Sequence, residues 1–327
     1  MSIGFLNFLK DWNQGQDSFT LTTSGSTGIP QEIELKRDLL IYSSEQTYKK
    51  LSFNKLTKIL NCISTNKVGG FMNWVRAAHF KLDIQTVEPV SDPMIYLSLG
   101  HNFTFVSLVP YQLYAILKNE ESKAKLNRFK TVLLGGSAIH TSGIEEIIKM
   151  DPVFVHSYGM TETYSHIGLK KIEEQGGLAY EAVGDIQIST GDKTILNGTI
   201  TSNKQLEIKD NLKWNEDGTF SFLGRKDNVI NTGGIKVSPE ALELRIQAVN
   251  NSLNLDIMVT SIPDKELGNK IILLVSEQKE ISFSNLENFE KPKEIFYHGS
   301  FLRNENGKLL RKETLKAFLS KVNGEQE

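Results

Sequence analysis

Cysteine is nearly absent from this sequence, because Cys62 is the only one among 327 residues. A single cysteine excludes a disulfide within the chain and a cysteine-based zinc cluster, and it is typical of a reducing compartment. We expect Cys62 to be a buried, small apolar residue. These features predict a cytoplasmic protein.

Long apolar runs and an excess of one charge are also missing. No stretch approaches the roughly 20 apolar residues of a membrane-spanning helix, and the N-terminus lacks a basic segment followed by an apolar run. The 37 Lys and Arg residues nearly balance the 39 Asp and Glu residues, which leaves a formal net charge of −2. The sequence therefore predicts no membrane span and no nucleic-acid partner, and any anion site must be local.

The length favours two domains of unequal size. Short apolar runs alternate with helical segments over residues 59–155, which is typical of an α/β domain with a largely parallel sheet. Residues 184–222 favour short strands and a smaller β-rich subdomain, and no internal repeat is present. We predict an α/β fold: a large N-terminal α/β domain with a β-rich subdomain at 1–224, a hinge at 225–227, and a small mobile C-terminal α+β domain at 228–327.

A loop rich in glycine and hydroxyl groups follows the predicted strand Phe19–Thr23. Residues 22–30 read TTSGSTGIP, with five hydroxyls and two glycines. Glycines permit a tight turn that exposes amides, and hydroxyls donate further hydrogen bonds, so such a loop can wrap a polyphosphate. An ordinary polar loop is the alternative, since the pattern is not GxxxxGK[ST]. The candidate phosphate ligands are Thr23, Ser24, Gly25, Ser26, Thr27 and Gly28.

This loop is similar to the phosphate loop of the adenylate-forming enzymes, a superfamily of acyl-CoA synthetases, peptide-synthetase adenylation domains and luciferases. The resemblance implies two steps at one site. A carboxylate and Mg·ATP give an acyl-adenylate and pyrophosphate, and the thiol of CoA then displaces AMP. ATP, Mg²⁺ and CoA are thus the expected cofactor set. Gln31 and Glu32 stand where relatives typically have lysine and glycine, so a cationic contact to the phosphates is expected to be missing.

Residues 157–163 read SYGMTET and come after the predicted strand Val153–Val155, near the edge where open α/β sheets bind ligands. The segment resembles the superfamily's YGxTE motif, which implies adenine packing by Tyr158, a phosphate contact by Thr161 and Mg²⁺ binding by Glu162. A capped helix start is the alternative. The resemblance also implies nucleotide contacts at Ser157, Gly159, Met160 and Gly136, and acyl contacts at Gly135 and Ser137.

Asp210 lies fifteen residues before Arg225, the spacing at which relatives keep an aspartate that holds both ribose hydroxyls. A carboxylate suits this role because it accepts two hydrogen bonds at once. A solvated loop aspartate is the alternative.

Residues 224–237 read GRKDNVINTGGIKV and resemble the superfamily's inter-domain block. The resemblance implies that Arg225 contacts the nucleotide, that Asp227 is the hinge, and that Gly234 lies where the CoA arm passes. A hinge is useful because groups that serve the first step must leave before the thiol attacks. A plain strand–turn–strand is the alternative.

Residues 303–311 read RNENGKLLR and are similar to the superfamily's last motif. The resemblance implies that Lys308 bridges the attacking carboxylate and the α-phosphate, where a positioned ammonium stabilises the developing negative charge. An Asn-Gly turn beside basic residues on the surface is the alternative.

Three segments resemble the o-succinylbenzoate–CoA ligases of menaquinone biosynthesis: GGFMNWVR at 69–76, VSLVP at 106–110 and YGMTETYS at 158–165. The resemblance implies that Arg76 faces the second carboxylate of a dicarboxylic aromatic acid, with Ser137 and Ser165 completing its hydrogen bonds. A helix-surface arginine is the alternative for Arg76. Lys67 stands where relatives usually have a histidine, which predicts a different wall of the acyl pocket.

Other functions stay open at this point. The chain could adenylate another aryl or fatty acid, serve a carrier protein, or bind nucleotide without turnover. Relatives carry a long segment before the phosphate loop, whereas Thr22 comes early here. Surface that such a segment covers in relatives would be exposed, and a homodimer is one way to cover it.

Overall fold

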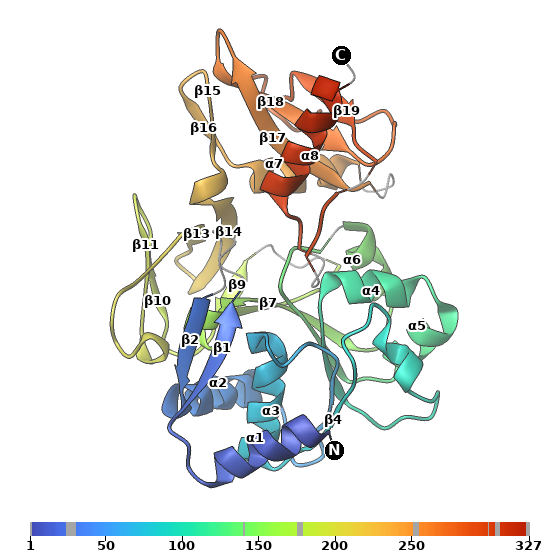
Figure 1. The fold of residues 1–327 in the computed structure, drawn as a ribbon, viewed down its shortest axis with the longest axis vertical. Coiled ribbons are helices and arrows are strands. Elements are labelled where there is room, and N and C mark those ends of the chain that lie inside the picture. Colours follow the sequence, from blue (N-terminus) through green and yellow to red (C-terminus); the bar gives the residue numbers. More distant parts are fainter. Residues whose placement is uncertain are drawn as a thin grey trace.

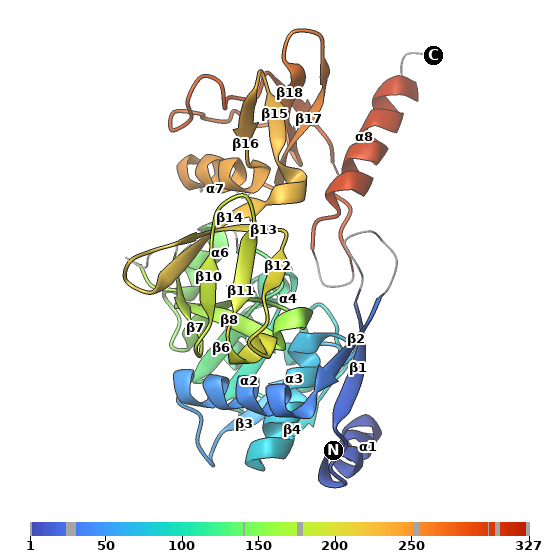
Figure 2. The same cartoon turned by 90° about the vertical axis from the view of Figure 1, so that its left-hand side faces the viewer.

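The computed structural model describes residues 2–23, 31–139, 141–174, 179–250, 255–299, 301–304 and 308–324. Figures 1 and 2 show the earlier elements gathered around one large sheet and the elements after residue 228 grouped at the opposite end of the molecule. Across the described ranges, every helix is too short or too polar to cross a membrane.

The large sheet has nine strands in the order β13-β14-β9-β8-β7-β6-β5-β3-β4. Its parallel half joins β4, β3, β5, β6 and β7, and its other half is antiparallel. This confirms the predicted α/β class. The strands are β3 (Lys58–Asn61), β4 (Asp83–Thr86), β5 (Phe105–Leu108), β6 (Thr131–Leu134), β7 (Val153–Met160), β8 (Ser165–Lys171), β9 (Tyr180–Ala182), β13 (Asp210–Trp214) and β14 (Thr219–Arg225).

Both faces of the parallel half are buried. Successive side chains of a strand point to opposite sides of the sheet, so neighbouring residues enter different cores. In β3, Ile59 joins one core and Leu60 the other, and Phe105 and Val106 divide in the same way in β5. The first core contains residues of α1 (Ile3–Asn13), α2 (Arg37–Lys50) and α3 (Val68–Phe80), and the second those of η1 (Pro93–Tyr96), α4 (Pro110–Leu117), α5 (Glu120–Leu126) and α6 (Thr141–Ile147).

The predicted β-rich segment 184–222 divides between two sheets. Strands β10 (Gln187–Ser189), β11 (Thr194–Asn197) and β12 (Leu206–Ile208) form a small separate sheet. The short helix η3 (Thr199–Thr201) lies between β11 and β12 in the chain. Strands β13 and β14 instead extend the large sheet through β9. Phe220 of β14 is fully buried and stacks on Tyr180 with 5.5 Å between ring centroids, so this strand belongs to the large core.

A hairpin of β1 (Ser18–Thr23) and β2 (Gln31–Lys36) precedes α2. The sequence predicted β1 but not β2, whose residues QEIELK are mostly polar. Leu35 is nevertheless fully buried in the first core, so the alternation in this short strand does place one anchor inside.

The C-terminal group is built on β17 (Ile257–Asp264), β18 (Gly268–Val275) and β19 (Glu294–Tyr297). One face of this sheet packs against α7 (Pro239–Val249) and the other against α8 (Arg311–Gly324), with alternate residues such as Val259 and Met258 entering opposite cores. The turn η4 (Lys226–Asn228) and the hairpin β15 (Ile230–Thr232) and β16 (Ile235–Val237) connect it to β14.

Candidate active site

The predicted phosphate residues Ser24, Gly25, Ser26, Thr27 and Gly28 lie outside the described residues. Their neighbours are held by the hairpin, because Thr23 at the end of β1 pairs with Gln31 at the start of β2. The two described residues that flank the predicted loop in the sequence are therefore paired neighbours in the hairpin.

The YGMTE segment begins inside a strand. We expected it to follow the strand at Val155, but β7 continues to Met160, and Thr161–Thr163 form the turn η2. The pairing of β7 with β8 shifts register between Tyr158 and Gly159. A Cβ on Gly159 would lie only 2.0 Å from the carbonyl oxygen of Ser165, so this close approach of two backbones requires glycine.

Asp210 connects Tyr158 with Arg225. The hydroxyl of Tyr158 donates a hydrogen bond of 2.6 Å to Oδ2 of Asp210, and Nη1 of Arg225 lies 3.6 Å from Oδ1 of the same carboxylate. Asp210 and Arg225 are cross-strand partners in β13 and β14, which explains their spacing in the sequence. Burial, together with the adjacent charge of Asp210, raises the pKa of Tyr158, so the phenol remains protonated.

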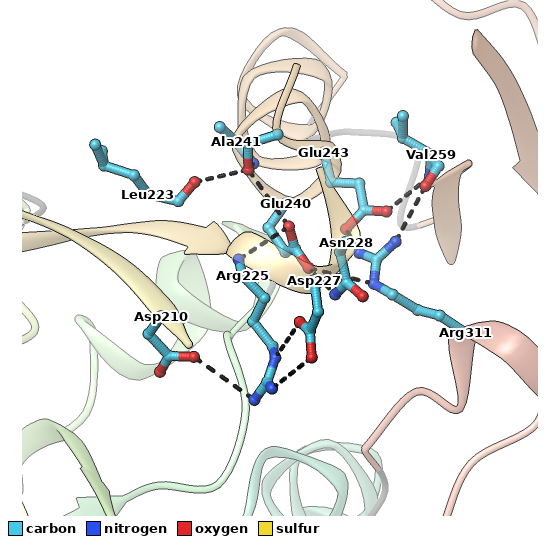
Figure 3. Close-up of polar contacts among 11 residues, drawn as sticks. Asp210, Leu223, Arg225, Asp227, Asn228, Glu240, Ala241, Glu243, Val259 and Arg311 are labelled. Carbon is cyan, nitrogen blue, oxygen red and sulfur yellow. Dashed lines mark hydrogen bonds and ion pairs between the residues drawn. The ribbon is translucent and has the colours of Figure 1, made fainter. Parts of the chain in front are cut away.

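Arg225 also holds the predicted hinge residue. Its Nε and Nη2 each lie 2.9 Å from an oxygen of Asp227, a two-pronged pairing that Figure 3 shows beside Asp210. The hydrogen bonds from Arg225 lower the pKa of Asp227, whose carboxylate is therefore ionised. The guanidinium of Arg225 thus lies between Asp210, the predicted ribose ligand, and Asp227 at the start of the C-terminal group.

Aromatic rings surround Tyr158. Its ring centroid lies 5.5 Å from that of Phe220 in an edge-on arrangement, 5.9 Å from Phe222 and 5.8 Å from Tyr180. These rings come from β7, β9 and β14, and they fix the plane of Tyr158 by contact on several sides. A partly buried aromatic face of this kind suits a flat base.

Arg76 is a buried residue of α3, and the helix-surface alternative for it is wrong: only 1% of Arg76 is exposed. Its Nη1 donates to Asn73 at 3.0 Å and its Nη2 to the hydroxyl of Ser165 at 3.4 Å. Burial lowers the pKa of Arg76 to about 9, so the side chain is still a cation at neutral pH. In the part of the chain that the structure describes, no carboxylate pairs with this guanidinium, and its Nε has no hydrogen-bond partner.

The glycine segment after β6 is fixed against β7. Ser157 donates to the carbonyl of Leu134 at 3.0 Å, and a Cβ on Gly135 would lie 2.6 Å from that serine hydroxyl. Gly136 has φ +89°, a left-handed conformation that favours glycine. The backbone conformation therefore favours glycine at 136, and the hydroxyl of Ser157 leaves little room for a Cβ at 135.

His156 holds the carbonyl of Ser137. Its Nε2 donates to this carbonyl at 2.9 Å, which leaves Nδ1 to accept from the hydroxyl of Tyr180 at 2.8 Å. Burial lowers the pKa of His156 to about 4, so the ring is neutral at physiological pH.

Thr161 is partly buried and Glu162 is exposed at the turn η2, beyond the end of β7. The structure thus brings Tyr158, Asp210 and Arg225 together, and separately Arg76 with Ser165. Gly234, with φ +83°, lies in the β15–β16 turn, and both views place that turn at the end of the C-terminal group that points away from the large sheet.

Lys308 is exposed and follows the C-terminal group's sheet. Its backbone pairs with Asn304, since Lys308 N donates to the side-chain oxygen at 2.9 Å and Asn304 N donates to the Lys308 carbonyl at 3.0 Å. The dark orange and red segment before α8 runs from this group toward the large sheet in both views.

Several residues of the site were not predicted, among them Asn73, His156, His166, Tyr180 and Phe220. His166 bonds Thr47 at 3.0 Å and lies next to Ser165, and burial lowers its pKa to about 3. The signal that could have found these histidines is their place beside the apolar runs VFV of β7 and IGL of β8, where consecutive residues are buried. Nothing in the residue pattern showed that β14 would bring Phe220 to the same place.

Comparison with known proteins identifies the family. The model of the AMP-binding enzyme family matches residues 10–212, more than half of the chain. The chain belongs to the AMP-binding enzymes. A relative in this family, the 2-succinylbenzoate–CoA ligase of Haemophilus influenzae, is 26% identical over 91% of this chain and 70% of its own length.

Solved structures of AMP-binding enzymes share the fold. An acyl-CoA synthetase (AMP-forming)/AMP-acid ligase II-like protein from Dyadobacter fermentans is 29% identical, with a TM-score of 0.65, and the alignment covers 95% of this chain and 92% of that one. The o-succinylbenzoate CoA synthetase of Bacillus subtilis in complex with the acyl-adenylate intermediate OSB-AMP has a TM-score of 0.76 at 19% identity, covering 90% of this chain and 68% of that one.

Proposed function

We propose that this AMP-binding enzyme is an ATP-dependent carboxylate–CoA ligase that works through an acyl-adenylate. The linked side chains Tyr158, Asp210 and Arg225 carry the proposal. Tyr158 offers a ring held in a fixed plane for adenine, and Asp210 offers carboxylate oxygens oriented by two neighbours for the ribose hydroxyls. Adenylation makes chemical sense because a carboxylate has no good leaving group, whereas AMP leaves readily.

Mg²⁺ is expected to enter with ATP. Among the described residues, no three His, Cys, Asp or Glu side chains gather into a metal cage. This arrangement fits Mg²⁺, which usually binds through one or two carboxylates together with substrate phosphates and water. Glu162, an exposed carboxylate just past the end of β7, is the residue that we assign to it. When bound, the ion would neutralise phosphate charge.

We assign Lys308 to the adenylation step, with Thr161 as a phosphate contact. The arrangement of elements suits a catalytic domain at 1–224, a hinge at 225–227 with Asp227 as its pivot, and a mobile domain at 228–327. Rotation about the hinge would withdraw Lys308 and carry Gly234 toward the thiol of CoA. Release of Asp227 from Arg225 would accompany that rotation.

We propose o-succinylbenzoate as the acid. A buried guanidinium with a free Nε and no described carboxylate partner needs an anion, because an unpaired buried charge is costly. The second carboxylate of a dicarboxylic aromatic acid supplies it, with Ser165 next to Arg76. Gly135 and Ser137 would line the acyl group. The name of the Haemophilus influenzae relative supports the same substrate.

We also propose a cytoplasmic location, in keeping with the buried thiol of Cys62. A homodimer stays part of the proposal. A molecular mass equal to that of one chain in solution scattering would overturn it.

The test is pyrophosphate release and thioester formation by the purified protein with Mg·ATP, CoA and a panel of acids that includes o-succinylbenzoate, fatty acids and aryl acids. Lys308→Ala is the comparison variant. We expect thioester from o-succinylbenzoate and loss of pyrophosphate release in the variant.

Other outcomes change the proposal in defined ways. Turnover with a different acid would keep the ligase and discard o-succinylbenzoate. Pyrophosphate release without thioester would indicate another acceptor, such as a carrier protein. AMP or ATP binding with no turnover on any acid would indicate a non-catalytic nucleotide-binding protein.

A further inference from the structure

The segment that carries Lys308 has two arms. Leu310 N donates to the carbonyl of Leu302 at 2.8 Å, and Arg303 and Leu309 form an isolated antiparallel bridge. Buried Thr314 of α8 secures the base, because its hydroxyl accepts from Leu302 N at 3.1 Å and its own N donates to Leu310 at 2.9 Å. We call the paired residues 302–304 and 308–310 the lysine hairpin. Its direction depends on how α8 begins.

Arg311 is the first residue of α8 and fixes this beginning. Its Nη1 donates to the carbonyl of Val259 in β17 at 3.0 Å, and its Nη2 pairs with Glu243 of α7. Glu243 in turn accepts from Val259 N at 2.7 Å. One guanidinium therefore joins three elements of the C-terminal group at the base of the lysine hairpin, three residues after Lys308.

Glu240 extends these contacts to the predicted hinge. Its Oε1 lies 3.6 Å from Nε of Arg311 and accepts from Asn228 at 2.5 Å, while its Oε2 lies 3.5 Å from Arg225 N. Figure 3 shows this carboxylate between Arg311 on one side and the Arg225–Asn228 turn on the other. A continuous polar path thus runs from the hinge to the base of the lysine hairpin.

We propose that Arg311 is a positioning residue for Lys308, and that Glu240 ties Arg311 to the hinge so that the lysine hairpin moves with the turn at 225–228. This inference rests on the proposed function, in which Lys308 serves adenylation. The aliphatic part of Lys308 is long and flexible, so the direction of the hairpin decides where its ammonium lies. A displacement of about 1 Å at a reacting group can cost on the order of 100-fold in rate.

The experiment compares Arg311→Gln and Arg311→Lys with Arg245→Gln. Arg245 is a matched control because it lies on the same helix as Glu243 and forms an ion pair of 2.6 Å with Glu290, away from the hairpin contacts given above. Two half-reactions are measured separately: pyrophosphate release from acid and Mg·ATP, and thioester formation from CoA and supplied acyl-adenylate. Hydrogen exchange at the amides of Asn304, Lys308 and Leu310 reports on the hairpin itself.

We expect Arg311→Gln to lower kcat for pyrophosphate release about 10- to 100-fold, with KM for ATP and thioester formation changed by less than about threefold. Arg311→Lys should recover part of the loss, and Arg311→Gln should add little to Lys308→Ala because the two act through one group. Exchange at the hairpin amides should rise in Arg311→Gln but not in Arg245→Gln.

Equal losses in both half-reactions, or equal effects of Arg311→Gln and Arg245→Gln, would mean a merely structural role and overturn the inference. Failure of the proposed function is distinguishable, since the unaltered protein would then release no pyrophosphate with any acid. In that case the amide exchange still decides whether Arg311 holds the hairpin, and unchanged exchange refutes it.

Discussion

The hydroxyl of Tyr158 donates a 2.6 Å hydrogen bond to Asp210, although 52 residues separate them in the chain. Arg225 approaches the other oxygen of the same carboxylate. Two neighbours therefore orient Asp210, and a carboxylate held in this way loses little conformational freedom when it accepts further hydrogen bonds. The relationship makes Asp210 the sharpest place to test nucleotide binding.

Asp210→Ala should raise the Kd for AMP about 10- to 100-fold, because hydrogen bonds to a charged acceptor contribute about 1.5–3 kcal/mol. Isothermal titration calorimetry with AMP measures it directly. Asp217→Ala is the control, since Asp217 is an exposed aspartate whose side chain bonds Thr219 in the turn between β13 and β14. Similar AMP affinity in both variants would remove Asp210 from the ribose site.

Arg76→Met should reduce kcat/KM for o-succinylbenzoate about 100-fold while AMP affinity changes less than about threefold, because the variant removes the charge that meets the second carboxylate. Steady-state kinetics and AMP titration separate the two effects. Thermal unfolding should show little destabilisation, since a buried cation without a described carboxylate partner costs free energy in the folded protein.

Arg128→Met is the control for Arg76, because it removes an exposed arginine whose side chain donates to the carbonyl of His101 at 3.4 Å. A loss of o-succinylbenzoate turnover in both variants, or in neither, would separate Arg76 from acid recognition.

The sequence predicted the parallel strands better than it predicted the acyl side of the site. Apolar runs such as Thr131–Leu134 leave few alternatives to a buried strand, although β7 continues five residues beyond its predicted end at Val155. The helix that carries Arg76 is different. Its segment GGFMNWVRAAHF has apolar residues on most faces, so periodicity did not show that an arginine would point inward.

Long-range partners explain the remaining differences. Strand β2 is polar in sequence and is fixed by its hairpin partner β1, and β14 joins the large sheet only because β9 lies at its edge. Such pairings depend on the three-dimensional arrangement and cannot be obtained from local propensity. The contact of Glu240 with Arg311, over 71 residues, is of the same kind.

Stability should fall as the pH drops from about 6.5 toward about 4, partly through His156. Its pKa is lowered from 6.5 to about 4 in the folded protein, so the unfolded chain binds the extra proton first. The contribution of His156 to the free energy of unfolding is fully present above pH 6.5. It is about 3 kcal/mol, and it is lost by about pH 4. The midpoint of denaturant unfolding should therefore change less with pH in His156→Gln than in the unaltered protein, over the range from about pH 4 to 6.5.

His79→Gln is the control for this pH dependence, because His79 is a partly exposed residue of α3 beside Glu45. Part of the slope should persist in His156→Gln, since burial also lowers the pKa of His166. An unchanged slope in His156→Gln would mean that the ring is not held neutral by its surroundings.

Gly159→Ala should destabilise the protein and impair nucleotide binding together. The added Cβ would lie 2.0 Å from the Ser165 carbonyl oxygen and 2.5 Å from Cα of His166, and both are backbone atoms that cannot rotate away. The two strands must then separate beside Tyr158, at a cost of about 2–3 kcal/mol. Gly191→Ala is the control, because nothing lies within 4 Å of a Cβ built there. Urea denaturation and AMP titration measure both effects. If Gly159→Ala matched Gly191→Ala in stability and in AMP affinity, the close approach of β7 and β8 would not be what places Tyr158.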